Sequence, residues 1–491
     1  MKKFILVLII FISSINLSAC KKSDDFLSLS ESLSNYNIQI NLNTDTHYLT
    51  ASQSIDYINN TNSILKQIKL HIYPEFFEEN PTNIVVSQTK LNEAYPKGIN
   101  YADFNLTRLT IDNNDSSPVF EGIYEDILVV NLPNSLLPNE RINIGLEYSI
   151  SLPNCEHRFG YADDTINLAN FYPIVCSFDD GKFDTSPYHF NGDPFYSDVA
   201  NYKVNITLDD QYIVAGTGES SISYAENNLK NVYFEARIVR DFAMVISNKF
   251  ELIENTINDT TVKYYYYNDI NSNKSLQAST DALNTFNKLF GNYPYSTLSV
   301  VQCDFVHGGM EYPNLVMISD SIENHDDYEN IIIHEIAHQW WYGMIGNNEY
   351  TYPWLDEALT EYSTILFYDY NEGYSLSHES MINSNHDNYS LFITVYEDVL
   401  GKIDTSMRAV DQYDTEPEYT YCTYVKGTLM YESLYQLIGE KSFIQGLQIY
   451  YKENLFKNCT PEDLISAFEE SSNKDLSNFF SSWINGKVII K

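Results

Sequence analysis

Cysteine is scarce in this chain of 491 residues, which holds only six. Apart from Cys20, the cysteines stand far apart, and none forms a Cys-x-x-Cys or another zinc-like pair. A cysteine-based zinc site is therefore not expected. Cys155 and Cys176 are the only pair close in sequence and could form one disulfide, while a chain without any disulfide is equally consistent. The remaining three are Cys303, Cys422 and Cys459.

Basic residues are also few: 29 Lys and Arg stand against 67 Asp and Glu, which gives a formal net charge of −38. Such acidity argues against nucleic acid and against an anionic membrane surface as partners. It favours peptides with a cationic end as ligands. A solvated surface that keeps the protein soluble explains the charge more simply.

Long apolar runs are absent after the first twenty residues. Lys2 and Lys3 follow Met1, and an apolar stretch covers residues 4–12. Leu-Ser-Ala before Cys20 then resembles a bacterial lipobox. We expect residues 1–19 to be a signal peptide, Cys20 to carry a lipid, and residues 20–32 to be a flexible tether. The protein is then an extracytoplasmic lipoprotein of a bacterial membrane. Ordinary secretion and an uncleaved anchor are the alternatives.

The pattern of residues 33–255 is that of β-strands. Apolar side chains alternate with polar ones in segments separated by clusters of Asn, Asp, Pro and Gly. Three such segments run from Tyr36 to Leu42, from Ile68 to Ile72 and from Tyr202 to Leu208. Alternation of period two with regular turns predicts a β-sandwich as the N-terminal domain.

A mixed pattern begins near residue 256. Strands are expected at residues 262–267, 298–301 and 315–318, a helix over residues 275–290, and further helices from residue 425 to the end. The length allows two to four domains. We therefore expect a multidomain α+β protein in which residues 256–491 form an α/β domain with a short helical C-terminal part.

Two histidines with helical spacing stand in this second domain. His334 and His338 flank Glu335 in the segment His-Glu-Ile-Ala-His, within a run whose apolar residues recur every three or four positions. Positions i and i+4 lie on one face of a helix, so both imidazoles point the same way, at a spacing that suits one metal ion. The alternative is a structural helix with two hydrogen-bonded histidines.

This helix has recognisable ends in the sequence. Asp326 is expected to cap its start, with Glu329 three residues later as the partner in a capping box. Gly343 and Gly346 are expected to mark its end.

A catalytic zinc ion usually takes three protein ligands and one water. Glu357 follows His338 after eighteen residues, in a segment that also has a helical pattern, with Pro353 suited to its first turn. Two helices would then supply His334, His338 and Glu357. Glu335 would lie close enough to act on a water at the metal without being an obvious ligand.

Three motifs in this order resemble the gluzincin signature of the aminopeptidase N-type zinc metallopeptidases. The first is Gly-Gly-Met-Glu-Tyr at residues 308–312, 21 residues before His334, where that family has Gly-x-Met-Glu-Asn. The second is the His-Glu-Ile-Ala-His segment with Glu357, and the third is Tyr-Val-Lys-Gly at residues 424–427. The resemblance implies a saddle-like N-terminal β-domain, a thermolysin-like catalytic domain, one zinc ion per chain and hydrolysis of peptide bonds.

The resemblance also implies roles for single residues. Glu335 is the general base, and Tyr424 stabilises the oxyanion. Glu311 pairs with the free α-ammonium of the peptide, so that one residue is removed at a time. Gly308 and Gly309 let the backbone of the substrate approach closely.

Some positions depart from the family pattern or add to it. Tyr312 stands where the family has Asn, and Ala358 stands where it has Gly. Glu361 either hydrogen-bonds a ligating histidine or is a solvated residue on the helix face. Tyr421 lies three residues before Tyr424 and is the second candidate for the oxyanion role.

In the family, a loop of the N-terminal domain also reaches the active site. Asn-Phe-Tyr-Pro at residues 170–173 and Arg-Asp-Phe-Ala at residues 240–243 resemble parts of that domain. His157, Arg158 and Asp193 stand in loop-like stretches, and we expect each to be an ordinary residue of a surface loop.

The sequence thus predicts a zinc aminopeptidase that removes N-terminal residues from peptides. About 65 residues follow the motif at Tyr424, whereas many family members continue into a helical domain that walls off the active site. A more open site is therefore expected, and a zinc endopeptidase or a dipeptide-releasing enzyme is the second hypothesis. The third is a surface binding protein on an inactive protease fold.

Overall fold

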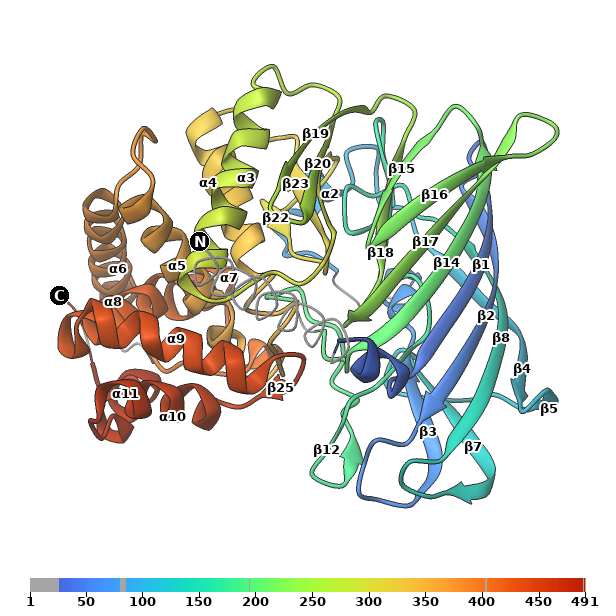
Figure 1. Cartoon of the computed structure of the whole chain (residues 1–491), viewed down its shortest axis with the longest axis horizontal. Helices are drawn as coiled ribbons and strands as arrows, with labels where there is room; N and C mark the ends of the chain where they lie inside the picture. Colours follow the sequence, from blue (N-terminus) through green and yellow to red (C-terminus); the bar gives the residue numbers. More distant parts are fainter. Residues whose placement is uncertain (1–25, 80–84, 194, 402–403, 489, 491) are drawn as a thin grey trace, which may run out of the picture.

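The computed structural model describes residues 26–79, 85–193, 195–401, 404–488 and 490. A β-rich half and a helix-rich half lie beside each other, with a mixed sheet between them (Figure 1). The expected signal peptide and the expected lipidation site at Cys20 fall outside the described residues, so both stay predictions.

The largest element of the N-terminal domain is an eight-stranded sheet with the order β16-β17-β14-β1-β2-β8-β4-β5. Every second side chain of β1 is buried, as the period-two pattern of Tyr36 to Leu42 predicts. The strands are β1 (Asn35–Asn43), β2 (Tyr48–Ile58), β4 (Asp103–Ile111), β5 (Asn114–Ser116), β8 (Arg141–Ser151), β14 (Ala200–Asp209), β16 (Glu219–Tyr224) and β17 (Leu229–Val239).

Two four-stranded sheets complete this domain, with the orders β15-β18-β10-β9 and β11-β3-β7-β6. Their strands are β3 (Leu65–His71), β6 (Val119–Glu121), β7 (Ile127–Leu136), β9 (Phe159–Tyr161), β10 (Ile166–Ala169), β11 (Ile174–Val175), β15 (Ile213–Gly216) and β18 (Ala243–Ser247). A hairpin, β12 (Phe178–Asp179) with β13 (Lys182–Phe183), the 3₁₀ helix η1 (Tyr73–Phe77) and the helix α2 (Leu91–Ala94) connect them.

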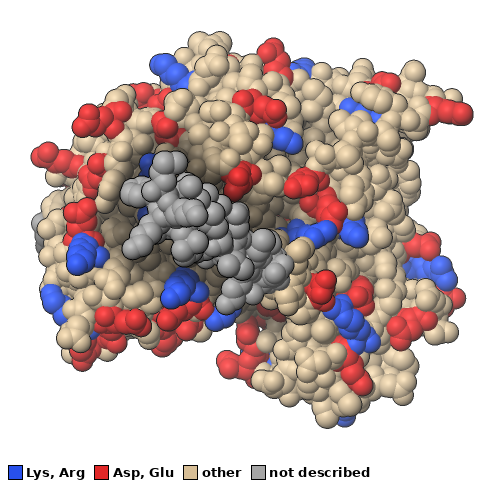
Figure 2. Space-filling model, viewed as in Figure 1, with Lys and Arg blue, Asp and Glu red and all other residues tan. Residues whose placement is uncertain are grey.

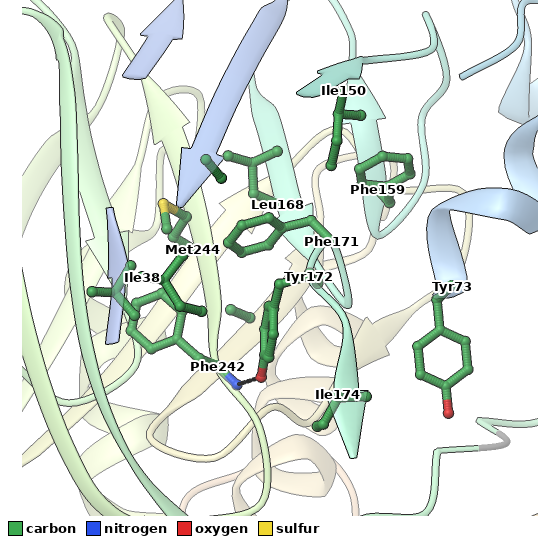
Figure 3. Close-up of a cluster of buried hydrophobic side chains, with 14 of the residues drawn as sticks. Ile38, Tyr73, Ile150, Phe159, Leu168, Phe171, Tyr172, Ile174, Phe242 and Met244 are labelled. Atoms are coloured by element: carbon green, nitrogen blue, oxygen red, sulfur yellow. Dashed lines mark hydrogen bonds between the residues drawn. The ribbon is translucent and has the colours of Figure 1, made fainter. Parts of the chain in front are cut away.

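One hydrophobic core lies between the large sheet and the smaller ones. Leu168 of β10 and Met244 of β18 face Ile38 of β1, with Phe171 and Phe242 beside them (Figure 3). All five side chains are buried. The predicted β-domain is confirmed, and its packed sheets form a rigid support for the loops that leave it.

The second domain begins with a five-stranded sheet of order β19-β20-β21-β23-β22. Its strands are β19 (Glu251–Ile257), β20 (Thr260–Tyr266), β21 (Thr297–Cys303), β22 (Gly309–Met310) and β23 (Leu315–Ser319). Helices α3 (Ser272–Leu289) and α4 (His325–Ala337) pack against it. Because β19 already pairs with β20, the break between the domains falls slightly before the expected residue 255.

The described residues after this sheet are mainly helical, and the helices predicted from residue 425 onward are present, whereas the sequence does not predict the helices His378–Leu400 and Glu416–Thr420. The helices are η2 (Pro353–Leu355), α5 (Glu357–Tyr370), α6 (His378–Leu400), η3 (Val410–Gln412), α7 (Glu416–Thr420), the π-helix η4 (Tyr421–Val425), α8 (Lys426–Ile438), α9 (Glu440–Asn454), α10 (Pro461–Ser472) and α11 (Ser477–Ile484). Two short strands, β24 (Gly346–Asn347) and β25 (Asn458–Cys459), pair in parallel and join the zinc-side segment to this helical part. No helix within the residues that the structure describes is long and apolar enough to cross a membrane.

The structure corrects the expected tether in part and decides between the two alternatives for the cysteines. Residues 26–31 form a short helix instead of a flexible tether, because Phe26 packs edge-on against Tyr295 and Phe456. Cys155 and Cys176 are free, buried thiols and form no disulfide with each other.

Candidate active site

Helix α4 carries the two histidines of the motif. Asn324 caps it, and the Asn324 side chain accepts a hydrogen bond from Asp326 N at 3.0 Å. The expected cap at Asp326 is therefore wrong by two residues: Asp326 lies in the first turn, where its charge complements the helix dipole. One side of α4 packs against α3 and β23, and His334 and Glu335 line a cavity on the other side.

The helix ends earlier than expected, at Ala337, with His338 as its C-cap. Residues 343–345 turn back, and their amides donate to the carbonyls of His338, Gln339 and Trp340. These bonds satisfy carbonyl groups that the end of the helix leaves without partners.

The two imidazoles and the carboxylate of Glu357 converge on one point. His338 Nε2 lies 3.1 Å from His334 Nε2 and 3.2 Å from Glu357 Oε2, and His334 Nε2 lies 3.6 Å from that same oxygen. Three ligands bound at about 2.0–2.1 Å to a tetrahedral zinc ion lie about 3.3–3.4 Å apart. The three predicted ligands are brought together at separations that fit a zinc ion.

Glu357 is placed by the start of helix α5. Asp356 caps this helix, and its Oδ1 accepts a hydrogen bond from Glu357 N at 2.8 Å. Pro353 does not lie in the first turn of α5; it opens the short 3₁₀ helix η2 just before it. The change of helix type between the two lets the Glu357 side chain enter the cavity from the first residue of α5.

Glu335 is buried and faces the same cavity. Burial is the main cause that raises the pKa of this carboxyl to about 7, while His334 and His338 oppose the rise. Its Oε2 accepts no hydrogen bond from the residues that the structure describes. A Cβ at Gly309 would overlap the Glu335 side chain, so glycine is required there for the close approach of strand β22 to the helix.

A carboxylate of the N-terminal domain meets Glu311 in the cavity. Oxygens of Asp193, Glu311 and Glu357 lie within 4.8 Å of one another, and Arg158 Nη2 lies 2.5 Å from Asp193 Oδ1. From the sequence we expected Arg158 and Asp193 to be ordinary residues of surface loops. This expectation is wrong, because both line the cavity. His157 is not on the surface either: it is buried between the rings of Phe77 and His307.

Glu311 is buried, and its Oε1 has no hydrogen-bonding partner among the described residues. Burial raises the pKa of Glu311 well above its usual value, and the carboxylates of Asp193 and Glu335 raise it further, against the effect of His338. A cation placed between these carboxylates would offset this repulsion.

Tyr424 reaches the metal ligands from the π-helix η4. Its hydroxyl donates a hydrogen bond to Glu357 Oε1. Burial and the Glu357 carboxylate raise the pKa of Tyr424 well above its usual value, so the phenol keeps its proton. Tyr421 stacks on Phe392 instead, with ring centroids 4.6 Å apart, and does not line the cavity, so the second candidate for the oxyanion role is excluded.

The residues that depart from the family pattern pack behind the site. Tyr312 is fully buried, and its hydroxyl donates to Asn170 Oδ1 at 2.6 Å, so its ring does not enter the cavity. Gln339 Nε2 donates to the Tyr312 carbonyl at 3.1 Å, which fixes the backbone beside Glu311. Glu361 Oε1 lies 3.6 Å from His334 Nδ1, so Glu361 faces a ligating histidine rather than bulk solvent.

The cavity that these groups line has a volume of about 270 Å³. Its wall further includes Phe190, His307, Asn330 and Glu416. Acidic groups dominate: Asp193, Glu311, Glu335, Glu357, Glu361 and Glu416 all line it, against the single arginine Arg158. The cavity is therefore suited to a small cationic group beside a metal ion.

Comparison with known proteins also indicates a peptidase domain in the second half of the chain. Residues 274–483 match the model of the Peptidase family M1 domain. Aminopeptidase N of Haemophilus influenzae is 28% identical over 198 residues, which are 38% of this chain and 22% of that protein. Aminopeptidase M1-A of Oryza sativa subsp. japonica is 25% identical over 277 residues, 52% of this chain and 30% of that protein.

Solved structures extend the likeness to both domains. The M1 zinc metallopeptidase from Deinococcus radiodurans has a TM-score of 0.67 to this chain at 15% sequence identity, over 94% of this chain and 96% of that one. A two-domain M1 zinc metallopeptidase variant bound to L-arginine has a TM-score of 0.65 at 15% identity, over 93% and 94%. The chain has the two-domain M1 fold, and residues 274–483 resemble the Peptidase family M1 domain.

The matches to the curated relatives are partial. The two aligned segments above span between about a fifth and a third of the relatives' own lengths. The comparisons show the fold and a family resemblance over residues 274–483, while the activity is inferred from the site.

Proposed function

We propose that this protein is a zinc-dependent aminopeptidase that hydrolyses N-terminal residues from peptides. The observation that carries the proposal is one cavity that holds three metal ligands, a free buried carboxylate at Glu335, and the acidic pair Glu311 and Asp193. Known members of the family support it, because Aminopeptidase N is the name of several relatives.

His334, His338 and Glu357 would hold the zinc ion. A zinc ion in such a site lowers the pKa of water to about 7 and polarises a carbonyl group. Glu335 lines the same cavity as these ligands and would take the proton of the attacking water, then deliver it to the leaving amine. Its unpartnered Oε2 and its burial suit a group that shuttles one proton.

Tyr424 supplies a hydrogen-bond donor at the oxyanion. Its hydroxyl already lies against Glu357 Oε1, at the edge of the ligand set. A neutral phenol there donates to the negative charge that develops on the carbonyl oxygen during attack. Tyr419 packs edge-on against the Tyr424 ring, with centroids 5.7 Å apart, and holds the ring in place.

Glu311 and Asp193 would bind the α-ammonium of the peptide. Arg158 pairs with Asp193, so with both carboxylates ionised the three groups carry one net negative charge, which a single ammonium neutralises. The unpartnered Oε1 of Glu311 is the free acceptor for that ammonium. With its α-ammonium bound there, the peptide would place its first peptide bond at the metal ligands.

The small size of the cavity favours this proposal over an endopeptidase. About 270 Å³ is slightly below the 300–1,000 Å³ of pockets for drug-sized ligands, which is room for the first residue or two of a peptide. A zinc endopeptidase needs space for chain on both sides of the bond. An inactive binding protein is disfavoured because it would not need Glu335 and Tyr424 beside a complete ligand set.

Metal content and the variant Glu335→Gln test the catalytic part of the proposal. We expect one zinc per purified chain, loss of peptide hydrolysis on chelation and its return with added zinc. Glu335→Gln keeps the ligands and should keep the zinc, but kcat should fall by about 10²–10⁴-fold because the proton acceptor is lost.

Glu329→Gln is the matched control. It changes a carboxylate on the same helix that pairs with His325 at 3.0 Å, away from the cavity, and should leave hydrolysis unchanged. Full activity of zinc-loaded Glu335→Gln would contradict the proposed role of the general base.

A further inference from the structure

A wide turn that contains Tyr342 follows the zinc-side helix. This residue has a φ of 138°, a conformation that non-glycine residues rarely adopt and that surrounding contacts must hold. Tyr342 N donates to Ile345 O at 2.9 Å, which closes the turn. The turn brings the amides of residues 343–345 back to the carbonyls at the end of α4.

The same turn sets the position of a carbonyl that contacts a metal ligand. His338 Nδ1 lies 2.9 Å from the Trp341 carbonyl oxygen, in the peptide group that ends at Tyr342. When Nε2 of a neutral histidine binds a metal, Nδ1 carries the hydrogen and donates it. The Trp341 carbonyl therefore orients the His338 ring and fixes its tautomer, together with Thr360 Oγ1 at 3.1 Å.

Two consecutive residues of the N-terminal domain hold Tyr342 at opposite ends. The Tyr342 hydroxyl donates to Asp241 Oδ2 at 2.6 Å, and Arg240 Nε donates to the Tyr342 carbonyl at 2.7 Å. All three residues are buried, so water does not compete with either bond. The side chain and the backbone of Tyr342 are thus both tied to the same short segment.

Arg240 and Asp241 are themselves firmly placed. The Arg240 guanidinium also donates to the carbonyls of Ser197 at 3.0 Å and Lys457 at 2.6 Å. A Cβ at Gly346 would overlap this guanidinium, so glycine is required where β24 passes it. On the other side, Phe242 N donates to the Tyr172 hydroxyl at 3.0 Å within the core of the N-terminal domain (Figure 3).

We infer that Arg240 and Asp241 are positioning residues for the zinc ligand His338, acting through the Tyr342 turn. The inference rests on the proposed zinc site and goes beyond it, because it makes the N-terminal domain part of the support of the metal. The rigid sheet domain holds Tyr342 in its strained conformation, Tyr342 holds the Trp341 carbonyl, and this carbonyl holds the imidazole.

The variant Tyr342→Phe tests this chain of contacts, because it removes the bond to Asp241 and keeps the ring. Tyr148→Phe is the matched control: it removes an equally buried hydroxyl, which donates to Gln53 Oε1 at 3.1 Å inside the N-terminal sheets, far from the metal ligands. The rate of zinc release to a colorimetric chelator, kcat and KM, and the melting temperature are measured for both variants and the unchanged protein.

We expect Tyr342→Phe to release zinc about 10–100-fold faster and to have a lower kcat with KM changed less than about twofold. Tyr148→Phe should match the unchanged protein in zinc release at a comparable melting temperature. Equal zinc release by the two variants would overturn the inference. If the unchanged protein binds zinc and cleaves peptides in that case, the proposed function stands and only the positioning role falls.

Asp241→Asn and Asp241→Ala provide a second pair that does not alter the strained residue. Asparagine still offers an oxygen to the Tyr342 hydroxyl, whereas alanine offers none. Zinc release close to that of the unchanged protein for Asp241→Asn and faster release for Asp241→Ala support the positioning role. Equal rates of zinc release from the two variants would contradict the positioning role. Failure of the unchanged protein to bind zinc at all would contradict it as well.

Discussion

Gly309 sets how closely strand β22 can approach Glu335 of helix α4. A Cβ there would overlap the Glu335 carboxylate, whereas a Cβ at Gly308 would lie 3.2 Å from the flexible end of Ile331. The two glycines of the motif are therefore not equivalent, although the sequence alone assigns both to the approach of the substrate backbone. Gly308 lies against the Ile331 side chain, which can move, and Gly309 lies against the proposed general base Glu335.

Gly309→Ala should therefore lower kcat by about 10–100-fold, because a displacement of about 1 Å at the base has effects of this size. Gly308→Ala should cost less, since Ile331 can shift. Zinc content measured alongside the kinetics should stay at one per chain in both. Equal activity of the two variants would show that the Glu335 side chain is not held by this contact.

The limits of sequence analysis are clearest at single residues of the site. His334, Glu335 and His338 can be predicted because their spacing along one helix needs no tertiary information. Asp193 and Arg158 cannot, because they reach Glu311 from another domain and no local pattern marks them. For the same reason, the contact of Asp241 with Tyr342 has no signal in the sequence beyond the presence of both residues.

At the scale of elements, the period of apolar residues predicts most strands and helices, while their ends depend on local hydrogen bonds. Helix α4 is capped by Asn324 rather than by Asp326, because the Asn324 side chain accepts a hydrogen bond from Asp326 N in the first turn. Residues 26–31 are helical because Phe26 finds apolar partners in Tyr295 and Phe456, which lie far along the chain. Composition alone favours a flexible tether there.

Three helices of the C-terminal part meet at one imidazole. His378 opens α6, its Nδ1 lies 2.7 Å from Asp369 Oδ2 on α5, and its Nε2 lies 2.9 Å from Glu432 Oε2 on α8. Both contacts require the protonated ring. They raise the pKa of His378 from 6.5 to about 9, with the Asp369 bond as the largest cause.

The stability that His378 contributes should therefore depend on pH. A raised pKa in the folded state stabilises the protein fully below the unfolded value of 6.5, and this gain is lost as the pH rises through about 9. Because the ring is partly exposed, we expect His378→Asn to lower the free energy of unfolding by about 1–2 kcal/mol at pH 6. Urea unfolding of the variant and of the unchanged protein at pH 6 and pH 10 measures this difference in free energy. A difference that is as large at pH 10 as at pH 6 would refute the stabilising role of the protonated His378.

At the scale of the whole molecule, the two domains share one site. Asp193 supplies a carboxylate from the N-terminal domain, and Thr89 Oγ1 donates to Glu416 Oε2 at 3.3 Å, so this domain also meets α7 at the wall of the cavity. On the face drawn in Figure 2, acidic and basic residues are spread over both halves. This distribution supports a solvated acidic surface on that face rather than one charged docking patch.

Lipid attachment at Cys20 is a prediction from the sequence that concerns the location of the whole molecule. We expect the full chain, produced in a bacterial host, to incorporate radiolabelled palmitate and to sediment with membranes. Cys20→Ser should abolish both, because the thiol that carries the lipid is lost. Cys155→Ser changes a buried free thiol and should leave labelling intact. Labelling of Cys20→Ser at the level of the unchanged protein would contradict the assignment.

The most direct test of the central claim is the hydrolysis of one peptide with a free N-terminus and of the same peptide acetylated, followed by mass spectrometry. The account predicts that only the free peptide is cleaved, one residue at a time, and that Glu311→Gln weakens this cleavage. Equal cleavage of both peptides by the zinc-loaded protein would contradict the aminopeptidase assignment and leave an endopeptidase on the same metal site.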